Sequence, residues 1–190
     1  DTVDEMMKWV DHAVSHARSR DASITELEFP YEYRKGQKQM AACVYKAIEG
    51  ERRLFVQAPT GIGKTMAAMF PSVKAFATGL VSKIFYLTAK TIAGTVPDQA
   101  LTLLRERGVK FSSVMLTAKE KICLNETMEC DAEHCPYAKG HFDRVNDALF
   151  ELITQEEKMD REIIRAYAER YQVCPFELGL DASLFADAII

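Results

Sequence analysis

The sequence has no long apolar run, no excess of positive charge and no internal repeats. Its 190 residues include 24 basic and 28 acidic side chains, which give a formal net charge of −4. A chain with this balance has no overall attraction for nucleic acid, so such binding would require a local basic patch. No apolar stretch approaches the roughly 20 residues of a membrane-spanning helix, and no secretory signal pattern precedes the rest. These absences leave a globular protein without a membrane segment.

The cysteine content also excludes one class of protein. There are five cysteines, an odd number, and no secretory signal accompanies them. Both facts argue against a disulfide framework. The length suits one ordinary domain, or one domain with an insertion. The chain has no starting methionine and closes on the apolar run 186–190, which resembles a strand, so we expect both ends to continue in a longer protein.

A glycine-rich loop is the most informative feature that is present. Residues 58–65 read Ala-Pro-Thr-Gly-Ile-Gly-Lys-Thr, between an apolar run predicted as a buried strand (53–57) and a predicted helix. A strand, a glycine loop, Gly-Lys-Thr and a helix form the context of a phosphate-binding loop. The first glycine of the common pattern is replaced by Ala58. The alternative, a chance glycine-rich turn, is disfavoured by the strand and helix on either side.

Each loop residue type has a chemical reason. Gly61 and Gly63 allow the backbone N–H groups to turn toward phosphate oxygens, and the helix N-terminus adds positive potential. Lys64 has the reach to contact the β- and γ-phosphates, and the Thr65 hydroxyl is a ligand for Mg²⁺. The loop therefore predicts binding of a nucleoside triphosphate with magnesium.

Strands and helices alternate over the first part of the chain, which predicts an α/β domain with a parallel sheet and three layers. An amphipathic helix is expected over residues 4–20, and Gly79 and Gly108 are expected to end two later helices. Cys43, within a predicted helix, is interpreted as a small buried apolar residue. The expected helices are 40–48, 65–78 and 95–107, and the expected strands are 53–57, 83–88 and 112–116.

From about Lys119 this alternation stops, and four cysteines follow: Cys123, Cys130, Cys135 and Cys174. Helices are expected over 141–154 and 160–172, with Asp160 as an N-cap. We interpret residues 119–178 as a mostly helical insertion.

The cysteine spacing leaves the metal undecided. Gaps of six, four and thirty-eight residues separate the four cysteines, and structural zinc sites favour pairs of tight Cys-x(2–4)-Cys knuckles. Cys135 and Cys174 are each followed by proline and an aromatic residue, and a Cys-Pro step recurs at ferredoxin cluster ligands. His134 is a further candidate zinc ligand, although its position beside Cys135 favours exposure. An iron–sulfur cluster, zinc and free buried thiols all remain open from spacing alone.

The phosphate loop and the four-cysteine segment together resemble the XPD/DinG family of superfamily 2 DNA helicases, over about residues 29–190. The resemblance implies a P-loop (RecA-like) parallel sheet with helices on both faces, interrupted by a mostly helical four-cysteine insertion with a [4Fe-4S] cluster. By that resemblance Tyr31, Arg34 and Gln37 form an adenine-recognising element. The implied boundaries are an upstream linker (1–28), motor domain 1 (29–118 and 179–190) and a cluster domain (119–178). The implied nucleotide contacts are Tyr31, Arg34, Gln37, Thr60, Gly61, Ile62, Gly63, Lys64 and Thr65; Lys64 and Thr65 are catalytic, and Cys123, Cys130, Cys135 and Cys174 hold the metal.

The resemblance also implies partners. Single-stranded or forked DNA is the expected substrate, translocated 5′ to 3′, and residues 87–91 with Lys90 and the Thr88 or Thr91 hydroxyl are expected to touch it. Lys119, Lys121, Lys139 and Arg144 supply local positive charge for the same purpose, although scattered charges are commonly solvated surface. The family's Asp-Glu-Ala-His segment does not occur in these residues. We therefore expect the activity to need the remaining motor domain, and we expect a cytoplasmic, bacterial-type protein that associates with the nucleoid on DNA.

Two other functions remain as alternatives. One is a P-loop ATPase of another kind, with a zinc-stabilised insertion and a protein substrate. The other is a metal-dependent interaction module with a degenerate nucleotide loop, against which the intact Gly63, Lys64 and Thr65 argue.

Overall fold

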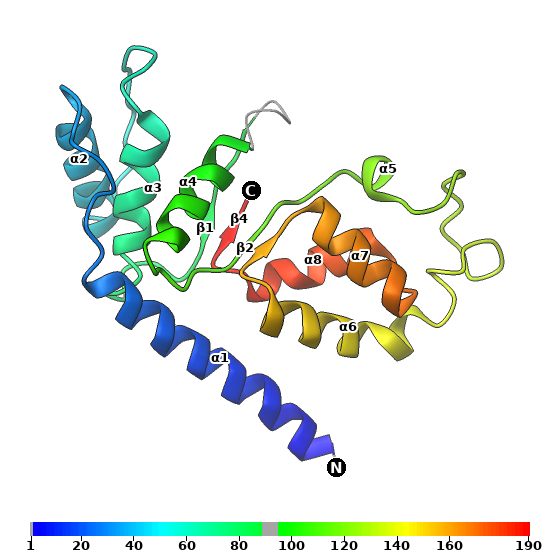
Figure 1. The fold of residues 1–190 in the computed structure, drawn as a ribbon. Helices are drawn as coiled ribbons and strands as arrows, with labels where there is room; N and C mark the ends of the chain where they lie inside the picture. The colour runs from blue at the N-terminus through cyan, green and yellow to red at the C-terminus, as the bar shows by residue number, and fades with distance from the viewer. Residues whose placement is uncertain (1, 89–94) are drawn as a thin grey trace. The chain divides into compact units, whose positions relative to one another are not determined.

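A computed structural model describes residues 2–88 and 95–190, which divide into two compact units (Figure 1). Unit 1 comprises residues 1–12 and 112–190, and unit 2 comprises residues 13–111. The first helix, α1 (Thr2–Thr25), contributes to both. None of the described helices has the length and hydropathy required to cross a membrane. These units are defined by compactness, and the boundaries expected after residues 28, 118 and 178 stay predictions.

Unit 2 is built mainly from helices. It contains the end of α1, α2 (Gln37–Glu49), α3 (Lys64–Lys74), a short strand β1 (Ile84–Phe85) and α4 (Thr95–Glu106). α3 packs between α2 and α4. Phe76 and Phe111 meet edge to face, with their ring centroids 5.0 Å apart, and Lys74 donates from Nζ to the carbonyls of Ile24 and Thr25 at the end of α1. Apolar packing and the hydrogen bonds of Lys74 therefore hold α3, the helix that follows the phosphate loop.

Two strands expected in unit 2 differ from the prediction. Residues 53–57 form no strand, and Phe55 is 93% exposed. A strand requires hydrogen bonds to a neighbour, and no strand within residues 2–88 or 95–190 pairs with this stretch. The strand expected over 83–88 shortens to β1, and Phe85 and Leu87 are exposed rather than buried. The predicted strand over 53–57 and the predicted burial of both stretches were therefore wrong, whereas a shorter strand within 83–88 is confirmed.

Unit 1 contains a parallel sheet. Its elements are β2 (Ser113–Val114), α5 (Lys119–Ile122), α6 (His141–Gln155), β3 (Lys158–Met159), α7 (Arg161–Tyr171), α8 (Pro175–Phe185) and β4 (Ala188–Ile189). β2 is central and pairs in parallel with both β3 and β4, giving the order β4-β2-β3. Ser113 is in register with Lys158 on one side and with Ala188 on the other. The α/β class and the expected strand near 112–116 are confirmed.

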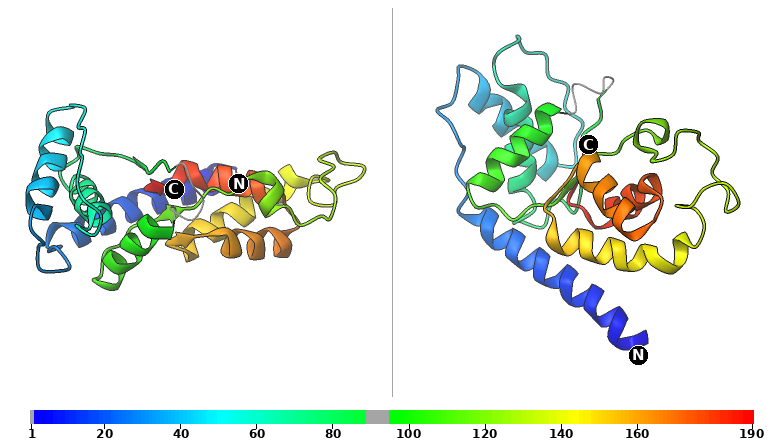
Figure 2. Two further views of the ribbon diagram at one scale, coloured as in Figure 1. Left: turned by 90° about the horizontal axis from the view of Figure 1, so that it is seen from above. Right: turned by 45° about the vertical axis from the view of Figure 1, so that its right-hand side comes forward.

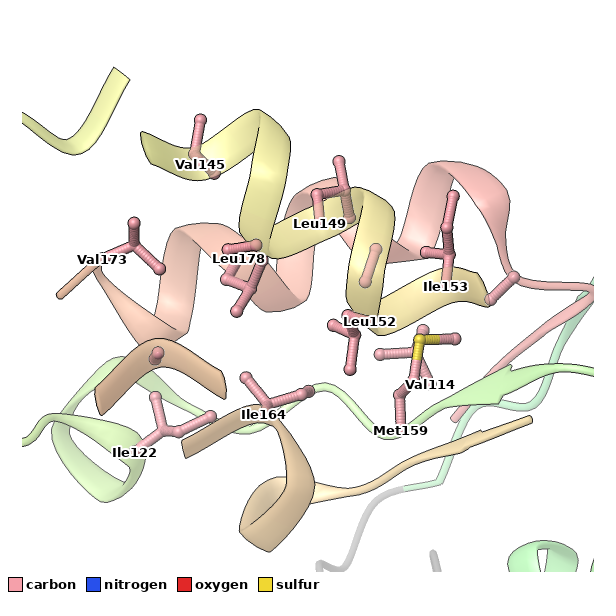
Figure 3. Close-up of a cluster of buried hydrophobic side chains, with 14 of the residues drawn as sticks. Val114, Ile122, Val145, Leu149, Leu152, Ile153, Met159, Ile164, Val173 and Leu178 are labelled. Atoms are coloured by element: carbon pink, nitrogen blue, oxygen red, sulfur yellow. The ribbon is translucent and has the colours of Figure 1, made fainter. Parts of the chain in front are cut away.

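The helices of unit 1 pack on one another and enclose its core. α6, α7 and α8 contact pairwise and lie side by side in both views of Figure 2. Figure 3 shows their inward side chains meeting Val114 of β2 and Met159 of β3. Leu152, Ile164 and Leu178, one from each helix, are almost fully buried there. Burial of such side chains contributes about 1.5–3 kcal/mol each, so this cluster is the main source of stability in the unit.

The expected helix boundaries in unit 1 largely agree with the structure. Asp160 accepts a hydrogen bond from the backbone N–H of Ile163 (3.1 Å), as the predicted N-cap of α7. α6 fits the expected range 141–154 to within one residue. α8 and β3 were not predicted, because apolar residues lie on most faces of α8 and form no distinct helical stripe, and β3 is only two residues long.

Ser112 and Asp187, the residues that directly precede β2 and β4, form a buried polar pair. Oδ2 of Asp187 accepts from the N–H of Ser112 (2.8 Å) and from its hydroxyl (2.9 Å), and the N–H of Asp187 donates back to the Ser112 hydroxyl (3.0 Å). Both residues are less than 10% exposed. Buried polar groups stabilise a fold only while they are paired, so this pair specifies how β2 and β4 align.

Asp187→Ala is expected to lower the free energy of unfolding by about 2–3 kcal/mol, because it leaves the Ser112 N–H buried without its acceptor. Urea denaturation monitored by circular dichroism measures this change. Glu162→Ala is the matched control, since its side chain is 72% exposed on α7, and it is expected to change the value by less than about 0.5 kcal/mol. Equal losses in the two variants would contradict a structural role for Asp187.

Candidate functional site

The phosphate loop leads into α3 as the sequence predicts. Gly63 is the N-cap of α3, with φ 80° and ψ 42°, and Gly61 has φ 83°. Both angles lie in the left-handed region that glycine adopts without a steric penalty. The first backbone N–H groups of α3 have no partner within the helix and are aligned with the positive end of its dipole. An anion placed before Lys64 would therefore meet unpaired donors.

Lys64 is folded back onto the loop that precedes it. Its Nζ donates to the carbonyls of Ala58 (3.0 Å) and Pro59 (2.8 Å). The ammonium thus lies inside the loop, held by two neutral acceptors. A phosphate oxygen is a stronger, charged acceptor, so the two carbonyls can be exchanged for phosphate with a net gain. Thr65 follows on α3 and is half-buried.

The segment before α2 contacts the phosphate loop directly. Gln37 is 3% exposed; its Oε1 accepts from the N–H of Arg34 (3.1 Å), and its Nε2 donates to the carbonyl of Gly63 (3.2 Å). The Arg34 guanidinium donates to the carbonyl of Gly61. The structure thus brings together two of the three residues of the expected adenine element and two glycines of the phosphate loop. The adenine role itself stays a prediction.

Tyr31, the third member of that element, is 59% exposed, and the described contacts give it no fixed position in the site. Tyr33 is the aromatic residue that the structure anchors. Its ring stacks on Phe29 with centroids 4.0 Å apart, and Phe29 meets Phe70 of α3 edge to face. Burial raises the pKa of the Tyr33 hydroxyl. The alternation of aromatic residues over 29–33 was the only sequence signal for this anchor.

A hollow of about 480 Å³ lies between α2 and α3, lined mostly by apolar side chains that include Tyr33, Tyr45 and Phe70. No residue of the phosphate loop lines it. This hollow is therefore not part of the candidate nucleotide site. That site is defined by the contacts of Arg34 and Gln37 with the phosphate loop.

The cysteine segment follows α5 as a long irregular stretch. Between Ile122 and His141 the structure contains turns and bends but no regular element (Figure 1). Most side chains of this stretch are exposed. Cys135 is buried, and its sulfur accepts a hydrogen bond from Nδ2 of Asn125 (3.1 Å). Cys123 is half-buried and Cys130 is exposed. Cys174 is the N-cap residue of α8, and burial raises the pKa of its thiol.

Lys119 connects two of these cysteines. Burial lowers the pKa of its ammonium, but the nearby Cys130, Cys174 and Glu177 side chains raise it above its usual value; the ammonium also lies 5.2 Å from the centre of the Phe176 ring. Within the described ranges, however, no three side chains of the histidine, cysteine or carboxylate type come together as a group that could hold a metal ion. The four thiols are of a type that suits a metal, and two of them, Cys130 and Cys174, interact electrostatically with Lys119.

The structure also places most of the other residues that the sequence singled out as metal ligands, buried thiols or phosphate contacts. His134 is exposed, as expected, and its ring contacts the carboxylate of Asp131 at 2.8 Å. Cys43 is exposed on α2, so its interpretation as buried was wrong. Arg144 donates to the carbonyls of Lys139, Tyr171 and Gln172, so it joins α6 to the end of α7; its expected contact with phosphate stays a prediction. Lys90 and Thr91 lie outside the described residues.

Comparisons with known proteins place the chain among helicases. The DEAD/DEAH box helicase family matches residues 34–158. A probable ATP-dependent helicase of Methanocaldococcus jannaschii is 43% identical over 47 residues, which make up 24% of this chain and 7% of that protein. The chain thus covers only a small part of that relative. The match over 34–158 includes Arg34, Gln37, the phosphate loop and three of the four cysteines.

Gly63→Ala is expected to lower the free energy of unfolding more than Gly79→Ala. Both glycines have φ above 70°, so each alanine costs about 1–2 kcal/mol of backbone strain. A Cβ at Gly63 would also overlap Nε2 of Gln37, whereas a Cβ at Gly79 would meet nothing within 4 Å. The lost Gln37 contact adds about 1 kcal/mol. Urea denaturation compares the two variants, and equal losses would show that Gln37 does not tie the loop in solution.

Proposed function

The chain belongs to the DEAD/DEAH box helicase family, and on that premise we propose that the protein is an ATP-dependent DNA helicase of the XPD/DinG type. These residues would supply the nucleotide-binding part of the first motor domain and an iron–sulfur segment. The observation that carries the proposal is the contact between the Arg34–Gln37 element and the phosphate loop, because it joins two parts of one nucleotide site. The intact loop argues against a degenerate interaction module.

The loop residues account for the first steps of an ATP cycle. An incoming triphosphate would replace the Ala58 and Pro59 carbonyls around the Lys64 ammonium and accept from the N–H groups that open α3. Thr65 would provide a hydroxyl for the Mg²⁺ that accompanies the triphosphate. Any shift of Gly63 on binding would move Gln37, since the two share a hydrogen bond. Loss of the γ-phosphate would reverse that shift.

The substrate and direction belong to the same proposal. We assign single-stranded or forked DNA as the substrate and 5′ to 3′ as the direction, with the second motor domain and the acidic box supplied by the rest of the protein. The supporting feature is the four-cysteine segment, which distinguishes this type within the wider family. Localisation in the cytoplasm, at the nucleoid during work on DNA, follows from the same assignment.

The cysteine segment supports a [4Fe-4S] cluster in three ways. Its four thiols are the ligand type that such clusters take. Its irregular stretch is longer than the 12–15 residues or so that loops reach without a functional reason, and it has little apolar burial to order it. Lys119 brings positive charge close to Cys130 and Cys174, which suits an anionic cluster held by thiolates. A bound cluster would crosslink Cys123, Cys130, Cys135 and Cys174 and so order the segment.

Lys64→Ala in the full-length protein is expected to lower ATP hydrolysis by about two orders of magnitude, because it removes the cation that stabilises charge on the transferred phosphate. Lys46→Ala, an exposed lysine on α2, is the control and is expected to keep the wild-type rate. Hydrolysis is measured with and without single-stranded DNA. Stimulation of the wild type by DNA supports a helicase, and indifference to DNA favours the ATPase that acts on a protein partner.

Anaerobically purified protein is expected to be brown and to contain about four iron and four acid-labile sulfide per chain. Cys123→Ser is expected to lose most of both, while Cys43→Ser keeps them because its exposed thiol lies on α2. Metal and sulfide analysis with visible absorption measures the outcome. Stoichiometric zinc without a visible band would replace the cluster with the zinc-stabilised alternative.

A further inference from the structure

A hollow of about 330 Å³ lies in unit 1 between the first turns of α1, α6 and the end of α7. We call it the acidic hollow. Its walls combine flat aromatic rings with carboxylates; the residues used below are Glu5, Trp9, Asp147, Phe150, Glu151 and Tyr171. Residues 1–33, which provide the α1 wall, precede the part of the chain that the helicase family matches. None of the residues that line the hollow belongs to the phosphate loop or is one of the four cysteines.

The aromatic wall is held in place by packing. The Trp9 indole meets the Phe150 ring at 5.0 Å with an interplanar angle of 65°, and it meets Phe185 of α8 at 5.2 Å. Trp9 is still only partly buried, so part of the indole remains accessible within the hollow. An indole face held in this way attracts cations through its quadrupole.

The charge of the walls is negative. Three carboxylates line the hollow, and Lys8 is the one cationic side chain among the lining residues. A hydrogen bond from the Tyr171 hydroxyl and the neighbouring Arg170 hold the pKa of Glu151 below its usual range, so this carboxylate stays ionised. A phosphate group would be repelled here, which excludes a nucleic-acid backbone as the ligand.

One edge of the hollow already holds a guanidinium in the way that a ligand would be held. Nη1 of Arg170 donates to Oε1 of Glu151 (2.7 Å), and its guanidinium carbon lies 5.3 Å from the centre of the Tyr171 ring. Asp147, Glu5 and the Trp9 ring offer the same two features, carboxylate and aromatic face, to the interior of the hollow. No ion pair of Glu5 or Asp147 is found among the described residues.

We propose that the acidic hollow binds a cationic side chain, arginine above all, that a partner protein inserts between α1 and α6. The size supports one side chain, since the volume is near the lower end of ligand pockets, about 300–1,000 Å³. The apolar rings suit the aliphatic stem of arginine, and its planar head stacks on aromatic faces while it pairs with carboxylates. This inference does not depend on the proposed helicase activity.

The test uses the fluorescence of Trp9, the sole tryptophan of the chain. The 190-residue chain is titrated with the blocked tripeptide Gly-Arg-Gly and with its citrulline analogue, which has the same shape without the charge. The arginine peptide is expected to change Trp9 emission in a saturable way that weakens with salt, and the citrulline peptide is expected to bind at least about fivefold more weakly.

Two variants, each of which replaces a carboxylate with a neutral amide, locate the binding site of the peptide. Asp147→Asn is expected to weaken the arginine peptide by about threefold to fivefold, while Asp143→Asn, an exposed carboxylate one turn earlier on α6 and outside the hollow, leaves it unchanged. Circular dichroism confirms that both variants fold. Equal binding of arginine and citrulline peptides, equal effects of the two variants, or no saturable change would overturn the proposal. If the free polyamine spermidine bound more tightly than the peptide, the assignment of a partner protein as the ligand would be overturned.

Discussion

The side-chain amide of Gln37 is the constraint on which the nucleotide site depends. It connects the turn before α2 with the carbonyl of Gly63, a residue 26 positions later, and it is almost fully buried. Because a buried amide is costly to leave unpaired, the turn and the phosphate loop keep one relative position. The loop accepts this contact only because Gly63 has no Cβ. The backbone at Gly63 therefore has two roles: it shapes the phosphate loop, and its carbonyl accepts the hydrogen bond from Gln37.

In unit 1 the polar segments are held by an apolar core and by one buried polar pair. Its strands are only two residues long, so backbone pairing contributes little. The helices α6, α7 and α8 provide the apolar cluster instead, and Ser112 with Asp187 fixes how the strands align. The cysteine stretch leaves this core at Ile122 and returns at His141, both of which are buried. The core thus holds the two ends of the stretch while its middle remains open to solvent.

The sequence predicted best where a local rule decides the structure. Gly-Lys-Thr opens a helix, Asp160 caps one, and apolar periodicity located α6, each through interactions within a few residues. It predicted poorly where burial depends on distant neighbours: Phe55 and Leu87 are apolar but exposed, and Cys43 faces solvent. Contacts such as the one between Gln37 and the Gly63 carbonyl join residues that are far apart in the chain, and no spacing rule reveals them. The helicase family was recognisable from the motifs, and the iron–sulfur type stays a proposal.

The unpaired stretch 53–57 also affects how the polypeptide behaves at high concentration. Its central residues Leu54, Phe55 and Val56 are apolar and all more than 40% exposed, and an exposed apolar segment outside any described strand is open to pairing with another chain. Intermolecular pairing grows with protein concentration, whereas folding of a single chain does not. The few residues that precede the phosphate loop therefore expose this polypeptide to self-association, which its net charge of −4 opposes.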